Sequence, residues 1–116
     1  MKHLFVFLLS LLTLITLSAK ADIKSQVAEI ESKVVKWRHH LHQNPELSNR
    51  EFKTAEMVAT HLKNLGLQVE KKVAYTGVVG VLNSGKPGPT IALRADMDAL
   101  PVKETSGVPF ASKAIG

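Results

Sequence analysis

Apolar and polar residues alternate along this chain with a helical period first and a strand period later. From Asp22 to Gln43, apolar side chains recur at three- and four-residue steps with charged side chains between them, which predicts an amphipathic helix. Asn44-Pro45 predicts its end, because the residue before a proline is pushed out of helical geometry. The apolar stripe of this helix consists of Ile23, Val27, Ile30, Val34, Trp37 and Leu41.

A second helix is predicted from Ser48 to about Leu65. Ser48 and Glu51 have the spacing of a capping box, in which Ser48 is the N-cap and Glu51 reaches back to it. Gly66 follows as a stop signal that can adopt the left-handed conformation. Glu46 is interpreted as ordering the turn between the two helices, and an active-site carboxylate is the alternative interpretation.

Beyond Gly66 the period of apolar residues changes to two. Leu67 to Val73 alternates between apolar and polar residues, which predicts a strand with one solvated face. Val78 to Leu82 predicts a second strand, apolar on both sides, with Gly80 as a bulge or a point of close approach. The apolar run that begins at Thr90 predicts a third strand, buried on both faces, and residues 102–110 read as a loop.

This order of elements predicts an α/β fold that the 116 residues do not complete. A strand that is apolar on both faces needs a covering layer on each side and a neighbouring strand on each edge. Two helices and three strands cover one face at most. We therefore expect residues 22–116 to be the opening portion of a larger catalytic domain.

Charged residues stand where the third predicted strand ends. Arg94, Asp96 and Asp98 follow the apolar run directly, and Pro101 ends it. In an extended backbone Asp96 and Asp98 point the same way, and two adjacent carboxylates favour a cation. In open α/β sheets this end of a strand is also where ligands bind. The alternative is structural: Arg94 pairs with Asp96, while Asp98 closes a turn.

The end of the first predicted helix is rich in histidine. His39, His40 and His42 do not share one helical face, so they cannot jointly chelate one metal ion there. Their more economical interpretation is favourable interaction with the C-terminal end of the helix dipole, and we place no metal on them. A metal-binding protein that uses these histidines stays as a separate hypothesis, which calorimetry with zinc would test.

Residues 1–21 have the pattern of a signal peptide. A short basic start precedes the apolar run Leu4 to Leu17, and Ala19-Lys20-Ala21 supplies a small-x-small cleavage pattern. The run is shorter than the roughly 20 residues of a spanning helix, so cleavage and export to a bacterial periplasm are expected, with an uncleaved anchor as the alternative.

Charge and cysteine content narrow the classes of partner. The formal net charge of +5 falls when Lys2 and Lys20 are cleaved off, and the remaining excess does not favour nucleic acid or an anionic membrane surface. There is no Cys, so no disulfide stabilises the exported portion.

From about residue 34 onward the chain resembles the exported metal-dependent amidohydrolases and peptidases. This family includes hippurate hydrolases, N-acyl-amino-acid amidohydrolases and auxin-conjugate hydrolases. The resemblance rests on several runs and single residues: Trp37 to Ser48, Glu51, Thr54, Gly77 to Gly80, Gly85, Pro87 to Pro101 and Glu104.

The resemblance implies a zinc-peptidase-like catalytic domain with a mixed central sheet that hydrolyses the amide bond of small N-acyl amino acids or peptides. It implies two divalent metal ions (zinc, manganese, cobalt or nickel) whose ligands lie downstream of this chain, and a possible homodimer of the full-length enzyme. Asp98 is implied as a catalytic-site carboxylate that orients a metal ligand, and Asp96 and Arg94 as residues lining the site.

Two functions of different classes follow from these observations. The first is the N-terminal fragment of an exported metal-dependent amidohydrolase, expected to be inactive as 116 residues. The second is a small exported binding or interaction module, not an enzyme, that reuses the same half-domain and docks through an open sheet edge. Continuation of the reading frame into a Cys-Gly-His-Asp motif would favour the first.

Overall fold

The computed structural model describes residues 22–114, and the predicted signal peptide over residues 1–21 lies outside them. The described elements are α2 (Ile23–Gln43), α3 (Phe52–Asn64), β1 (Gln68–Val73) and β2 (Gly77–Val81). Among the described residues, 22–34 and 35–114 belong to two separate units, and the site lies within the second. No helix of the described residues is long and apolar enough to cross a membrane.

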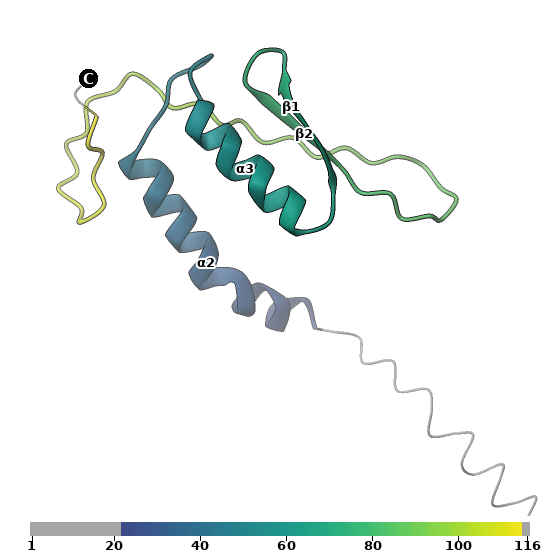
Figure 1. Ribbon diagram of the computed structural model, residues 1–116. Coiled ribbons are helices and arrows are strands. Elements are labelled where there is room, and N and C mark those ends of the chain that lie inside the picture. The colour runs from purple at the N-terminus through teal and green to yellow at the C-terminus, as the bar shows by residue number, and fades with distance from the viewer. Residues whose placement is uncertain (1–21, 115–116) are drawn as a thin grey trace, which may run out of the picture. The chain divides into compact units, whose positions relative to one another are not determined.

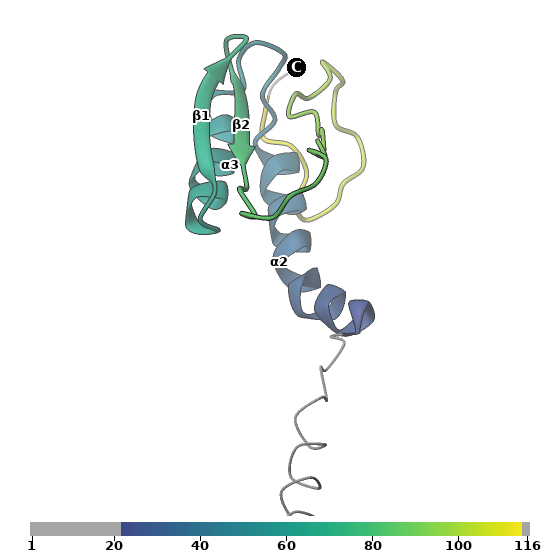
Figure 2. The ribbon, with the colours of Figure 1, turned by 90° about the vertical axis from the view of Figure 1, so that its right-hand side faces the viewer.

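Strands β1 and β2 form an antiparallel hairpin with α3 against it (Figures 1 and 2). Gln68 is opposite Val81 and Val73 is opposite Gly77, and the register shifts between Lys71 and Val73. The extra residue is Lys72, whose φ of 63° marks it as a bulge. The bulge predicted as one possibility at Gly80 is therefore at Lys72.

Gly80 is instead the point where the hairpin approaches its neighbours most closely. A Cβ atom at Gly80 would lie 3.0 Å from Leu62 Cδ1 on α3 and 3.0 Å from Leu67 Cδ2. Ala59, which is fully buried, belongs to the same helix as Leu62. The predicted close approach is confirmed, because only glycine leaves room for these side chains.

The end of α3 has the predicted glycine stop. Gly66 has φ of 84°, and its N–H donates to the carbonyl of Lys63 at 2.9 Å. The N–H of Leu67 donates to the carbonyl of Leu62 at 3.1 Å, which completes a Schellman motif. The chain thereby reverses directly from α3 into β1.

The predicted capping box at the start of α3 is wrong. The helix begins at Phe52, with Glu51 rather than Ser48 at its N-cap position, and Glu51 makes no side-chain cap hydrogen bond. The Glu51 carboxylate is buried and accepts a hydrogen bond from Thr76 Oγ1 at 2.7 Å, across to the hairpin. Glu51 thus ties α3 to the start of β2, and another carboxylate serves the N-terminus of α3.

The predicted third strand and mixed sheet are not confirmed by the described residues. Residues 90–98 form no strand, and the sheet has the two strands β1 and β2. The side chains of Ile91 and Leu93 are 82% and 97% exposed. A strand exists only through hydrogen bonds to a neighbour, and this segment has no neighbouring strand among residues 22–114.

Candidate functional site

The acidic segment, defined as Arg94 to Asp98, lies at the surface of the described structure. Arg94 Nε and Nη2 donate to Asp96 Oδ1 at 3.2 and 3.0 Å, and these side chains are 90% and 71% exposed. Asp98 is also exposed. The pairing of Arg94 with Asp96 is the structural alternative considered from the sequence, and an ion pair this exposed contributes little to stability.

The backbone directly after Asp98 is attached to the turn between α2 and α3. The N–H of Ala99 donates to the carbonyl of Glu46 at 2.8 Å, and Leu47 forms an isolated parallel bridge with Ala99. Asp98 therefore sits beside a fixed point of backbone, although the segment before it forms no strand.

The side chain of Glu46 caps α3. Its carboxylate accepts hydrogen bonds from the backbone N–H groups of Lys53 at 3.1 Å and Thr54 at 2.8 Å, and from Thr54 Oγ1 at 2.8 Å. Partial burial raises the pKa of Glu46, but the hydrogen bonds from Thr54 and Lys53 outweigh it and hold that pKa below its usual value. The interpretation of Glu46 as ordering the interhelical turn is confirmed, because it satisfies N–H groups that the helix leaves free.

A second attachment joins the last turn of α2 to residues 102–114, which contain no helix or strand. His42 Nε2 and Glu104 Oε2 lie 2.5 Å apart. The ring of Phe110 stacks on His39 with centroids 3.7 Å apart and meets the ring of His42 edge-on at 5.6 Å. We refer to His39, His42, Glu104 and Phe110 as the clasp.

The carboxylate of Glu104 has several hydrogen-bond partners, which the sequence pattern around it does not predict. Its carboxylate accepts hydrogen bonds from the backbone N–H groups of Ser106 at 3.0 Å and Ser112 at 3.5 Å, besides its contact with His42. Hydrogen bonds from the side chain and backbone of Ser106, and then from His42, lower the pKa of Glu104 to about 2. Glu104 is therefore ionised throughout the physiological range.

The clasp was not predicted from the sequence. Glu104 figured only among the residues of the resemblance, and His39 and His42 were interpreted through the helix dipole. The available signal was weak: a carboxylate and a phenylalanine in an aperiodic segment, together with histidines at a helix end. His61 on α3 is half-buried, and its ring meets the Trp37 ring edge-on at 4.6 Å.

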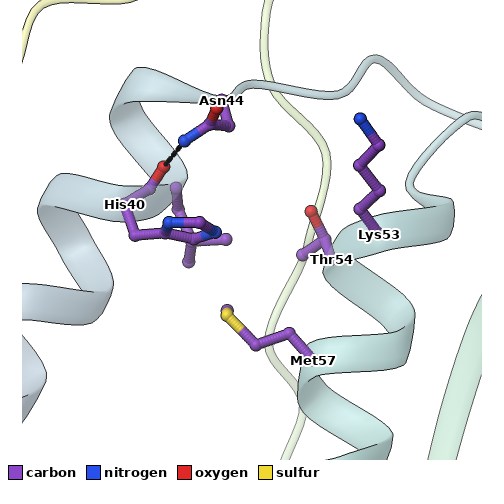
Figure 3. Close-up of a pocket in the computed structure, with 6 residues that line it drawn as sticks. His40, Asn44, Lys53, Thr54 and Met57 are labelled. Atoms are coloured by element: carbon purple, nitrogen blue, oxygen red, sulfur yellow. Dashed lines mark hydrogen bonds between the residues drawn. The ribbon is translucent and has the colours of Figure 1, made fainter.

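A shallow pocket of about 270 Å³ opens between the last turns of α2 and the start of α3 (Figure 3). Asn44 Nδ2 donates to the carbonyl of His40 at 2.8 Å at its edge. Its lining residues are His40, Leu41, Asn44, Lys53, Thr54 and Met57. None of them belongs to the acidic segment, so this pocket does not extend the predicted site.

The described residues do not assemble a metal centre. Across residues 22–114, no group of three or more His, Cys, Asp or Glu side chains is placed to hold a metal ion. Asp96 and Asp98 thus do not form a ligand set with a third side chain of this range. The two metal ions implied by the resemblance do not fit residues 22–114 on their own.

Comparison with known proteins identifies the relatives of this chain. No family model matches it. It is 52% identical over 95 residues to thermostable carboxypeptidase 2 of Saccharolobus solfataricus, covering 81% of this chain and 24% of the relative. It is 44% identical over 88 residues to the hippurate hydrolase of Campylobacter jejuni, covering 76% of this chain and 23% of the relative.

A solved structure agrees with these sequence matches. A protein of methicillin-resistant Staphylococcus aureus, assigned provisionally as an aminohydrolase, superposes with a TM-score of 0.72 at 43% identity. The superposition covers 77% of this chain and 24% of that one. The sequence and fold comparisons thus agree on one class of relative, hydrolases that act on C–N bonds.

Within that class, the chain is similar in sequence to amidohydrolases and peptidases that include hippurate hydrolase and N-acyl-L-amino acid amidohydrolase. The chain spans about a quarter of the length of the curated relatives it matches.

Proposed function

We propose that this chain forms part of the catalytic domain of an exported, metal-dependent amidohydrolase that cleaves the amide bond of N-acyl amino acids. The observation that carries the proposal is the 44% identity to a hippurate hydrolase over 88 residues. A fixed backbone position beside Asp98 supports it, because catalytic groups need a rigid support.

In this proposal Asp98 orients a metal-ligating residue outside the described range, and Asp96 and Arg94 line the site. Carboxylates that hydrogen-bond a ligand fix its orientation and raise its basicity. Zinc, manganese, cobalt or nickel ions, when bound in the complete enzyme, would polarise the amide carbonyl and make a water molecule more acidic. Residues 22–114 bring no complete ligand set, so we expect the 116-residue chain alone to be inactive.

The proposal also includes the cellular location of the enzyme and its oligomeric state. Residues 1–21 would direct export to a periplasm and be removed after Ala21. N-terminal sequencing of the protein recovered from the periplasm tests this, and Asp22 as the first residue is the expected result. A homodimer of the complete enzyme is expected, which light scattering of the purified enzyme would test.

The third strand belongs to the same proposal. Ile91 and Leu93, exposed among the described residues, would be covered by further strands and a further helical layer in the complete mixed sheet. The same exposed apolar side chains are what a small binding module would present to a partner, which is the second candidate function.

One assay separates the two functions. The gene is expressed with its natural reading frame beyond codon 116, and glycine release from hippurate is measured with and without a chelator. The enzyme proposal expects hydrolysis that the chelator abolishes and added divalent metal restores. Absence of hydrolysis, together with a cooperative melt of the soluble 116-residue chain, would favour the binding module.

A further inference from the structure

The segment that follows Asp98 is held against the end of α2 by individual contacts, two of them between side chains, rather than by secondary structure. Residues 102–114 contain no helix or strand, so no ladder of backbone hydrogen bonds fixes their position. Three contacts with α2 hold them instead: the His42–Glu104 pair, the stack of Phe110 on His39, and the N–H of Lys113 donating to the carbonyl of Gln43 at 3.1 Å. Figure 2 shows this segment, in yellow, returning beside α2.

The same short stretch of backbone supports both the acidic segment and residues 102–114. The carbonyl of Gln43 accepts a hydrogen bond from the N–H of Lys113. The carbonyl of Glu46 accepts one from the N–H of Ala99, which is next to Asp98. The clasp therefore attaches residues 102–114 to the C-terminal end of α2. The turn that follows this end holds the backbone of Ala99, next to Asp98.

We propose that His42, acting through Glu104, is a positioning residue for the hydrolase site. This inference rests on the proposed function. By pairing with Glu104, His42 keeps residues 102–114 and the adjoining Asp98 in one fixed arrangement. The Glu104 side chain is 18% exposed and that of His42 is 44% exposed, so the carboxylate is the better protected partner. Within residues 22–114, His42 pairs with Glu104 and makes no hydrogen bond to Asp96 or Asp98, so its effect is indirect.

The test compares single and double substitutions in the complete enzyme. His42→Leu and Glu104→Gln are each expected to lower kcat about tenfold or more with little change in KM, since small displacements of reacting groups cost large factors. The double variant should be no slower than the slower single variant, because both substitutions break one pair. His42→Gln should recover part of kcat, since its amide can still donate to Glu104.

A control and a second measurement separate positioning from stability. Glu56→Gln removes the exposed Lys71–Glu56 ion pair, in which Lys71 Nζ and Glu56 Oε2 lie 2.8 Å apart, and should leave kcat unchanged. Hydrogen exchange at the amides of Ser106 and Ser112, which bond to Glu104, should accelerate in His42→Leu and not in Glu56→Gln.

Each outcome decides the proposal. Faster exchange with wild-type kcat would overturn the positioning role, and unchanged exchange would overturn the clasp itself. If the wild-type enzyme fails to hydrolyse N-acyl amino acids, the proposed function fails and the positioning role for this reaction fails with it. The exchange comparison would then still decide whether the clasp exists.

Discussion

The backbone N–H of Ala99 donates to the carbonyl of Glu46 at 2.8 Å, while the carboxylate of Glu46 accepts hydrogen bonds from Thr54 and Lys53. One residue thus connects the N-terminus of α3 with the backbone beside Asp98. Because Glu46 uses its main chain for one contact and its side chain for the other, substitution of the side chain affects the α3 contact selectively.

Glu46→Ala is expected to destabilise the protein by about 1 kcal/mol, the ordinary cost of losing an N-terminal cap. Ser48→Ala is the matched control, because Ser48 is exposed and lies outside α3, and its effect should stay within about 0.5 kcal/mol. Urea denaturation followed by circular dichroism measures both. A larger loss of stability for Ser48→Ala than for Glu46→Ala would support the capping box of Ser48 and contradict the cap by Glu46.

Gly80→Ala is expected to destabilise the protein by about 1–3 kcal/mol through overpacking. The new Cβ atom would lie 3.0 Å from Leu62 Cδ1 and from Leu67 Cδ2, which is tighter than ordinary contact. Adding Leu62→Ala removes one of the crowded atoms. The free energy of unfolding of the double variant should therefore fall by less than the sum of the falls in the two single variants. Full additivity in the same denaturation experiment would show that Gly80 and Leu62 are not in close contact.

Acid is expected to release the clasp at an unusually low pH. The pKa of Glu104 lies at about 2, below its ordinary value of 4.5, so its hydrogen bonds contribute stability above about pH 4.5. That contribution declines as the pH falls from 4.5 and is lost once the pH passes below about 2. The chemical shift of the Ser106 amide, followed by NMR in an acid titration, reports this step.

The control for the titration is Glu104→Gln, which removes the ionisable group and should remove the step from the Ser106 amide. A wild-type midpoint at the ordinary value of 4.5 would mean that Ser106 and His42 do not hold the carboxylate in solution.

The exposure of the Leu93 side chain provides a test of the proposed third strand. Leu93 is 97% exposed in the described structure, so Leu93→Asp should leave the stability of the 116-residue chain unchanged. In the complete enzyme the same substitution should prevent folding or cost several kcal/mol, since it buries an unpaired charge. Lys86→Asp, at an exposed turn, is the control for the added negative charge. Equal tolerance of Leu93→Asp in the complete enzyme would contradict the proposed third strand.

The helices and the hairpin could be predicted because their signals are local. Apolar periodicity located α2, α3 and β1, and β2 begins at Gly77 rather than at the expected Val78. The proline after α2 and the glycine after α3 ended the helices as expected. The capping box failed because the spacing of Ser48 and Glu51 carries no information about Glu46 or Thr76, which take the relevant contacts.

Features that depend on residues distant in sequence could not be predicted in the same way. The third strand requires neighbouring strands, and a hydrophobic run does not reveal whether they are present. Glu104 reaches His42 across most of the described chain, so no periodic pattern connects them. The candidate site is predicted as a chemical pattern in Arg94, Asp96 and Asp98, whereas its supports at Glu46 and His42 emerge only from the fold.

The central claim is that Asp98 serves the hydrolase site, and turnover by the complete enzyme tests it most directly. The kcat for hippurate should fall about 10- to 100-fold in Asp98→Asn, the usual effect of losing a carboxylate that orients a metal ligand. Asp96→Asn, which breaks the exposed pair with Arg94, should reduce kcat less, and both variants should melt at the wild-type temperature. Wild-type kcat in a folded Asp98→Asn enzyme would contradict the account.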